Sequence, residues 1–248
     1  MSVSGVTIIK NGMKLGYPFI EAVLSILDVC DEIIISEGYS EDGSDIILEE
    51  AFLCQPKVRI YHDRWQPCKS GREIARITDK AVSRASCDWI YYIQADEIVH
   101  ESNHAVIRAI ANSDINANSA AFSFLHFQGS WEHVIEKPSY IAAIRMFRNG
   151  RNILSHHDGW SFHGDVNPVL DCTSNCKPIY HYGWVFKENI REKKINRAML
   201  YPDIPGYLRT IDDPWFPEPP EPNFFDSHPA VMKPLIGLNK YSPLGISA

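Results

Sequence analysis

A short apolar run that stops at two adjacent acids constrains the fold of this chain more than any other feature. The run Tyr91-Tyr92-Ile93 has the composition of a buried strand, and Gln94-Ala95-Asp96-Glu97 follows it directly. A strand interior does not tolerate unpaired carboxylates, so we expect Asp96 and Glu97 at the C-terminal edge of a sheet. Open α/β sheets bind ligands in the crevice outside this edge. The pattern therefore predicts an α/β fold in which a divalent cation and a diphosphate would meet beside Asp96.

The residues before this run repeat a strand and helix pattern. Short β-rich runs occur at residues 5–9, 33–35 and 58–61, and apolar residues at helical spacing follow them. Parallel strands in successive units of this kind need crossover connections, which place helices on the faces of the sheet. We therefore expect a Rossmann-type, mostly parallel central sheet flanked by helices, with an elaboration at its C-terminal side.

Composition limits the class of protein. The chain has 248 residues, 45% hydrophobic and 22% charged, so it can bury a full core as one compact domain with two joined halves, 1–112 and 113–248. Its net charge of −7 includes no basic block, which argues against a nucleic-acid partner. No apolar stretch approaches the roughly 20 residues of a transmembrane helix, so we expect no transmembrane segment and a cytoplasmic location.

Five sequence motifs together resemble one known family. They are Val6-Thr7-Ile8-Ile9-Lys10-Asn11, Ser36-Glu37-Gly38, Gln94-Ala95-Asp96-Glu97, His181-Tyr182-Gly183-Trp184 and Ser227-His228-Pro229. The set resembles the family-2 type of nucleotide-sugar glycosyltransferase with the GT-A fold, and the last two motifs are similar to a bacterial and viral branch of that group. The resemblance implies transfer of a sugar from a UDP- or GDP-linked donor to a hydroxyl of a glycan, lipid or protein acceptor. It also implies that residues 1–112 bind the nucleotide sugar and metal, and that residues 113–248 bind the acceptor.

The resemblance also indicates the nucleotide side of the site. In the family an acid after the second strand contacts the base, and this position is Glu37. The Asp-any-Asp motif of the family falls on 94–96, so Asp96 is retained, whereas Gln94 replaces the ribose-side acid and supplies no charge. Two arginines open the helix after the third strand, where each could meet the nucleotide or lie on a solvated face. The expected nucleotide-binding residues are Ile9, Lys10, Asn11, Glu37, Gly38, Arg72, Arg76, Gln94, Ala95 and Asp96.

A divalent cation is the expected cofactor, because it can neutralise the charge that gathers on a diphosphate leaving group. Asp96 would supply a carboxylate oxygen, and either Glu97 helps to hold the ion in place of the missing acid or the dependence on metal is weaker than is usual in the family. A histidine from the second half commonly completes such a site in related enzymes, and His181 is the matching residue. Imidazole suits manganese better than magnesium, so we expect Mn²⁺, with Mg²⁺ as a weaker substitute.

An inverting transferase also needs a general base that takes the proton of the acceptor hydroxyl. Three acids of the second half are candidates: Asp158, Asp165 and Glu132. We favour Asp158, because its loop combines turn residues with neighbouring aromatics and imidazoles that could stabilise a carboxylate.

Two other functional classes compete with a glycosyltransferase. A nucleotidyltransferase would use a similar sheet and metal, but residues 10–14 form only a sparse version of its phosphate loop. An inactive relative that binds a nucleotide sugar or a glycan is the second alternative, because Gln94 replaces an acid. Outside these motifs, the lysine-rich stretch 187–194 is typical of the solvated face of a helix, although it could also contact acidic glycans or diphosphate lipids. The proline-rich stretch 202–222 is typical of an extended surface arm.

Overall fold

The computed structural model describes residues 1–66, 72–200 and 221–245. Nearly all of the proline-rich stretch 202–222 therefore lies outside the described residues. Within the described ranges, no helix is both long enough and apolar enough to cross a membrane.

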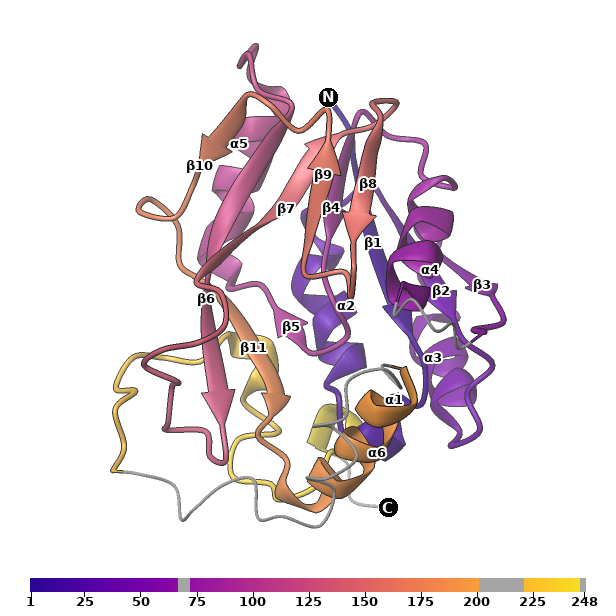
Figure 1. The fold of residues 1–248 in the computed structure, drawn as a ribbon, viewed down its shortest axis with the longest axis vertical. Helices are drawn as coiled ribbons and strands as arrows, with labels where there is room; N and C mark the ends of the chain where they lie inside the picture. The colour runs from indigo at the N-terminus through magenta and orange to yellow at the C-terminus, as the bar shows by residue number, and fades with distance from the viewer. Residues whose placement is uncertain (67–71, 201–220, 246–248) are drawn as a thin grey trace.

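The first half forms the expected parallel part of the sheet (Figure 1). Its strands are β1 (Val3–Ile9), β2 (Glu32–Glu37), β3 (Val58–His62) and β4 (Trp89–Tyr92). They pair in parallel in the order β3-β2-β1-β4. The helices that connect and flank them are α1 (Gly12–Leu15), α2 (Phe19–Leu27), α3 (Ser44–Phe52), α4 (Glu73–Val82) and α5 (His104–Asn112), with a 3-10 turn at Glu101–Asn103. The strand and helix repeat predicted from the sequence is confirmed.

Most strands of the second half extend the same sheet. These are β6 (Ser119–Gln128), β7 (Ala142–Arg148), β10 (Val169–Asp171) and β11 (Ile179–Trp184), whereas β8 (Ile153–His156) and β9 (Ser161–Gly164) form a separate two-stranded hairpin. β7 runs antiparallel to both β4 and β6, and β11 runs parallel to β6. Helix α6 (Ile190–Leu200) follows β11 after a 3-10 turn at Lys187–Asn189, and two further 3-10 turns lie at Ala230–Met232 and Pro243–Gly245. One mostly parallel curled sheet thus joins both halves of the chain.

Two apolar clusters cover the two faces of this sheet. On one face α2, α3 and α5 bury residues such as Val23, Leu48 and Ile107 against the strands. On the other face α4 and the β8–β9 hairpin bury residues such as Ile77 and Phe162. The hairpin therefore lies over β1 and β4 of the first half, although it comes from the second half (Figure 1).

The predicted strand before the two acids ends earlier than expected. β4 stops at Tyr92, and Glu97–Ile98 form a separate short strand, β5, which pairs antiparallel with β11. This pairing places Glu97 opposite His181, and the Tyr182 amide donates to the Asp96 carbonyl at 2.8 Å. Asp96 therefore lies in the bend between β4 and β5. The pairing also brings together two motifs that are far apart in the sequence.

Candidate active site

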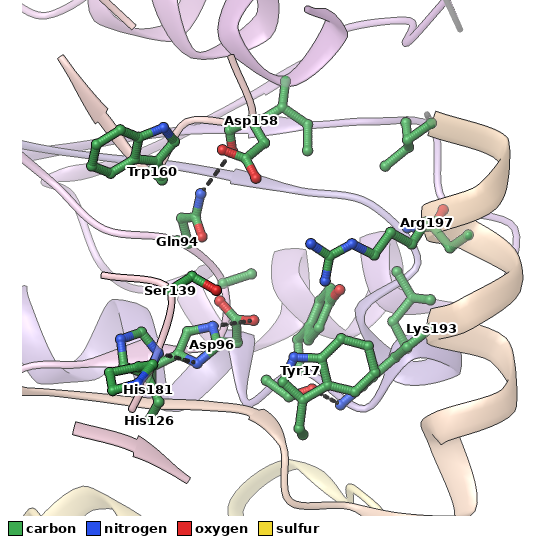
Figure 2. Close-up of a pocket in the computed structure, with 18 of the residues that line it drawn as sticks. Tyr17, Gln94, Asp96, His126, Ser139, Asp158, Trp160, His181, Lys193 and Arg197 are labelled. Carbon is green, nitrogen blue, oxygen red and sulfur yellow. Dashed lines mark hydrogen bonds and ion pairs between the residues drawn. The ribbon is translucent and has the colours of Figure 1, made fainter. Parts of the chain in front are cut away.

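A pocket of about 670 Å³ lies at the carboxyl ends of β1 and β4. The bend after β4, the turn of the β8–β9 hairpin, the end of β11 and helix α6 all contribute to its lining (Figure 2). Its polar residues include Lys10, Gln94, Asp96, His126, Asp158, His181, Lys193 and Arg197. Three tryptophans, Trp65, Trp160 and Trp184, line it as well, whereas Trp131 is buried in the core with only 8% exposure. The pocket thus lies where the sequence predicts a ligand.

Asp96 is held at the floor of this pocket by tight local packing. Its Oδ2 lies 3.3 Å from His181 Nε2, and its side chain is 13% exposed. Burial opposes its ionisation, yet the His181 imidazole and the Lys193 ammonium together lower the pKa of Asp96. Gly183 makes room for the carboxylate, because a Cβ at this position would lie 2.5 Å from Asp96 Oδ2. The glycine of the His181-Tyr182-Gly183-Trp184 motif is therefore a steric requirement of the Asp96 site.

A chain of hydrogen bonds fixes the orientation of His181. His126 Nε2 lies 3.0 Å from the Tyr140 carbonyl, which can only accept, so His126 carries its proton on Nε2. Burial and the neighbouring His181 lower the pKa of His126 to about 3, so His126 is neutral near pH 7. Its Nδ1 then accepts a hydrogen bond from His181 Nδ1, 3.3 Å away. His181 Nε2 is left facing Asp96. Burial lowers the pKa of His181, but Asp96 outweighs this and raises it.

The ligand atoms of Asp96 and His181 fit a divalent cation that is also held by the phosphates of a bound nucleotide. Asp96 offers a carboxylate oxygen, and His181 offers its Nε2 atom. The other ring nitrogen of His181, Nδ1, is held by its hydrogen bond to His126, which is the usual arrangement for a metal-binding histidine. Within the described ranges, no group of three or more His, Cys, Asp or Glu side chains is placed to hold a metal. Phosphate oxygens and water would therefore supply the remaining ligands, as they commonly do for such ions at nucleotide sites.

Glu97 does not join Asp96, although the sequence predicts it as a helper ligand. Its two carboxylate oxygens accept from Arg145 Nε at 2.8 Å and Arg145 Nη2 at 2.6 Å, and both side chains are fully buried. Glu97 Oε2 also accepts from the backbone amide of Gln94 at 3.0 Å. The Glu97 carboxylate is thus part of a buried ion pair that shapes the bend after β4.

Three hydrogen bonds hold the hairpin turn that carries Asp158. The His157 carbonyl accepts from the Ala75 amide at 3.2 Å, and the Asp158 carbonyl accepts from Gln94 Nε2 at 3.0 Å. The Trp160 carbonyl accepts from Arg145 Nη1 at 2.8 Å. Asp158 Oδ1 is buried and has no hydrogen-bond partner among the described residues. The backbone of the turn is therefore tied to three other segments, and the Asp158 carboxylate is left for another role.

The other two candidate bases lie elsewhere. Asp165 is exposed at the far end of the β8–β9 hairpin, where its amide donates to the Asn152 carbonyl at 3.0 Å. Glu132 is exposed too, and its carbonyl accepts from the amides of Asn223 and Phe224 at 3.0 Å. Neither residue lines the pocket, whereas Asp158 does.

Only some of the predicted nucleotide-binding residues line the pocket. Lys10, Gln94, Ala95 and Asp96 do so. Asn11 lines a smaller adjacent cavity between α1 and α6, and Lys10 lines both. Gly38 lies behind Lys10, because a Cβ there would lie 2.7 Å from both Lys10 Cβ and Trp65 Nε1. The Trp65 indole lines both cavities, and its Nε1 is a buried donor with no partner among the described residues.

The remaining predicted residues contact other parts of the chain. Glu37 is fully buried, and its carboxylate accepts from the amides of Tyr39 at 2.8 Å and Ser40 at 2.7 Å. Ile9 is a core residue of β1. Arg76 forms an ion pair with the buried Glu73 at 2.6 Å. Arg72 is exposed at the start of that helix.

Sequence reasoning missed the contribution of helix α6. The expectation of a solvated lysine face at 187–194 is wrong for its last two members, since Lys193 and Lys194 are only 2% and 3% exposed. Lys193 and Arg197 line the pocket from successive turns of α6 (Figure 2). Burial lowers the pKa of Lys193 to about 7, against the opposing effect of Asp96. The i, i+4 spacing of the two cations was the available signal, but it does not show which face is buried.

Comparison with known proteins shows similarity to glycosyltransferases. The glycosyltransferase SunS, encoded by a prophage of Bacillus subtilis and by Bacillus phage SPbeta, is 29% identical over 203 residues, 74% of this chain. The chain covers 43% of the length of these curated relatives. No protein-family model matches the chain.

The fold comparison agrees with this similarity. The Staphylococcus aureus TarS fragment 1–349 in complex with UDP-GlcNAc superposes with a TM-score of 0.52 at 12% identity, over 80% of this chain and 67% of the other. The complex of the same fragment with UDP also gives a TM-score of 0.52. At this level of identity the likeness concerns the fold, which is therefore of the GT-A glycosyltransferase type.

Proposed function

We propose that this chain is a glycosyltransferase that moves a sugar from a nucleoside-diphosphate sugar to an acceptor hydroxyl, with inversion at the anomeric carbon. The observation that carries the proposal is the convergence of Asp96, His181 and Asp158 on one pocket at the strand ends of a GT-A-type sheet. The name of the SunS relatives supports the reaction class. The UDP and UDP-GlcNAc bound to TarS support a UDP-linked donor over a GDP-linked one.

The roles follow from the chemistry of the side chains. Asp96 and His181 would hold Mn²⁺, or Mg²⁺ less tightly, and such an ion would supply positive charge to the leaving diphosphate. Asp158 would take the proton of the acceptor hydroxyl as its oxygen attacks the anomeric carbon. The bond from that carbon to the diphosphate breaks as the new glycosidic bond forms. The acceptor, whether glycan, lipid or protein, would enter from the side of Asp158 and Trp160.

The proposal divides the work between the two halves of the chain. Residues 1–112 would bind most of the nucleotide, through Lys10, Trp65 and Asp96. Residues 113–248 would bind the acceptor and contribute His181 to the metal. Trp65 replaces Glu37 as the proposed contact to the base or ribose, because the Glu37 carboxylate already binds two amides of its own loop.

Binding and turnover measurements on matched variants test the proposal. Calorimetry with UDP, GDP and their sugars, with and without Mn²⁺, should give metal-dependent binding of one nucleotide to the wild type. The Asp96→Asn variant should lose the metal-dependent part. Asp158→Asn should keep nucleotide binding but lose about a hundredfold or more in release of nucleoside diphosphate from the donor, whereas Asp165→Asn serves as its control and should be unaffected.

Three outcomes would contradict the proposal. Absence of nucleotide binding in the wild type under every metal condition would remove the assigned site. Release of pyrophosphate from a nucleoside triphosphate and a sugar phosphate would show a nucleotidyltransferase instead. Tight binding of a nucleotide sugar without turnover, given a panel of glycan, lipid and peptide acceptors, would show an inactive binding relative.

A further inference from the structure

Helix α6 brings a buried cation to the wall of the pocket. Lys193 Nζ donates to the Gly183 carbonyl and, at 3.3 Å, to the Gly16 carbonyl. It lies 5.1 Å from the centre of the Tyr17 ring, and the lysine is only 2% exposed. Buried ammonium groups are normally paired with a carboxylate, because removing the charge from water costs much free energy. Among the described residues no carboxylate forms an ion pair with Lys193.

The position of Lys193 relative to Asp96 is set by Gly183. The Gly183 carbonyl accepts from Lys193, while the space beside the Gly183 Cα is filled by Asp96 Oδ2. The ammonium and the carboxylate therefore both lie against the same glycine. A ligand that reaches a metal ion on Asp96 would also come within reach of Lys193.

Arg197 adds a second cation on the same face of α6. It follows Lys193 by one helical turn, so both side chains project in the same direction. Figure 2 shows the Arg197 guanidinium directed into the pocket, between the Tyr17 ring and the Gln94 side chain. Guanidinium and ammonium groups are the usual protein partners of phosphate oxygens.

The helix that carries these cations is fixed to the first half of the chain. Asn189 Nδ2, just before α6, donates to the Lys14 carbonyl at 3.0 Å, and Lys14 forms an ion pair with Glu192 at 3.2 Å. A Cβ at Gly16 would lie 2.5 Å from the Asn189 side chain, which shows how closely the two segments pack. The cations are thus prepositioned, and little conformational entropy remains to be lost when an anion binds.

Charge balance favours a phosphate-containing ligand at this wall. A divalent cation together with the Asp96 carboxylate leaves one net positive charge, whereas at neutral pH the donor nucleotide sugar carries about two negative charges and the released nucleoside diphosphate about three. Gln94, which stands where the resembled family has an acid, leaves the site less negative. Lys193 and Arg197 would supply the further positive charge that the metal ion and Asp96 do not provide.

We propose that Lys193 and Arg197 form a cationic clamp on α6 that binds the diphosphate of the donor without requiring the metal ion. This inference rests on the proposed function, since it names how the same pocket holds the donor. Its consequence is that part of the affinity for a nucleoside diphosphate should persist when divalent cations are removed.

Calorimetry in EDTA tests the clamp, with UDP, GDP, uridine and guanosine as probes. The wild type should bind the preferred diphosphate more tightly than its nucleoside. Lys193→Met, which keeps the length of the side chain, should weaken diphosphate binding about ten- to a hundredfold and leave nucleoside binding unchanged. Arg197→Gln should act in the same direction. Lys194→Met is the matched control, because Lys194 is equally buried but does not line the pocket.

The outcomes separate the clamp from the proposed function. Equal affinity of the wild type for diphosphate and nucleoside in EDTA, or unchanged diphosphate affinity in both clamp variants, would overturn the clamp. In those cases Mn²⁺-dependent binding that is lost in Asp96→Asn would still support the proposed function. Failure of the wild type to bind any nucleotide with or without Mn²⁺ would overturn both. If Lys193→Met does not fold, Arg197→Gln decides, since Arg197 is only partly buried.

Discussion

Asp96 and Glu97 are neighbours in the sequence, but they belong to two different environments. Glu97 is fully buried and holds Arg145 through two short hydrogen bonds. Asp96 borders the pocket, and its nearest partner is a histidine nitrogen at 3.3 Å. The difference shows that a carboxylate beside a sheet edge becomes structural when a guanidinium satisfies it, and remains available for a ligand when its partner can also bind metal.

Loss of the Glu97 charge should have the largest effect on stability. Glu97→Gln would leave the Arg145 guanidinium buried without its counter-ion, so we expect the free energy of unfolding to fall by about 3–5 kcal/mol. Chemical denaturation followed by circular dichroism measures this. Asp96→Asn is the matched control, and it should change stability by less than about 1 kcal/mol. Equal losses in the two variants would remove the distinction between the two acids.

A double variant sharpens the same comparison. Replacing both members of a buried ion pair by apolar residues of similar volume is often neutral, because no charge is left without a partner. Glu97→Met with Arg145→Met should therefore recover most of the stability lost in Glu97→Gln. The Trp160 carbonyl would still lose its hydrogen bond from Arg145, so the turn that carries Asp158 should become more mobile. Amide hydrogen exchange of residues 157–160 measures that change.

The two acids also show what the sequence could and could not predict. Alternating strand and helix patterns predicted the four parallel strands of the first half, because each strand is a continuous apolar run such as Ile33–Ile35. The end of one such run placed Asp96 at the ligand-binding edge, and the family resemblance pointed to Gln94 and to a base such as Asp158, but only the structure brings the three together at one pocket. The separation of Glu97 from Asp96 was not predictable, because it depends on Arg145, which lies 48 residues away.

Helix α6 escaped prediction for a different reason. Its sequence from Ile190 to Leu200 has five charged residues among 11, four of them consecutive, so its pattern indicates a solvated helix. In the structure two of these lysines are buried, and one of them reaches carbonyls on two other segments. Pattern arguments assume that charged residues face water, and they fail where a buried charge is held by backbone carbonyls.

A methyl group at Gly183 should disturb the Asp96 environment and leave the Glu97 environment intact. The added Cβ of Gly183→Ala would lie 2.5 Å from Asp96 Oδ2, so the carboxylate must move. We expect Mn²⁺-dependent nucleotide affinity to fall about ten- to a hundredfold, the usual range for a perturbed metal surrounding. Calorimetry on Gly183→Ala, Asp96→Asn and the double variant tests whether Gly183→Ala acts by displacing the Asp96 carboxylate. If the effect passes through Asp96, the two changes will not be additive.

Glu37 provides the test with the smallest expected effect. This acid also ends a strand, so its carboxylate is either structural, like that of Glu97, or available to a ligand, like that of Asp96. Its hydrogen bond to His62 Nδ1, 2.9 Å long, raises the pKa of His62 above its ordinary value. Because the pKa of His62 is higher in the folded state, the Glu37–His62 pair stabilises the fold fully at pH values below the unfolded-state pKa of about 6.5. This stabilisation is lost as the pH rises through the folded-state pKa of His62. Titration of the His62 ring by NMR should give a lower pKa in Glu37→Gln, and a smaller decrease in Glu49→Gln, since Glu49 contributes less to the shift.

Addition of nucleotide then decides which environment Glu37 shares. Its carboxylate already accepts from the amides of Tyr39 and Ser40 and binds His62. A satisfied carboxylate of this kind resembles Glu97, so saturating UDP or GDP should leave the His62 pKa unchanged. A shift of that pKa on nucleotide binding would show that the base contacts Glu37, as the resemblance to the glycosyltransferase family implies. Glu37 would then be a ligand-binding acid like Asp96, because its carboxylate would bind the nucleotide in addition to its partners within the fold.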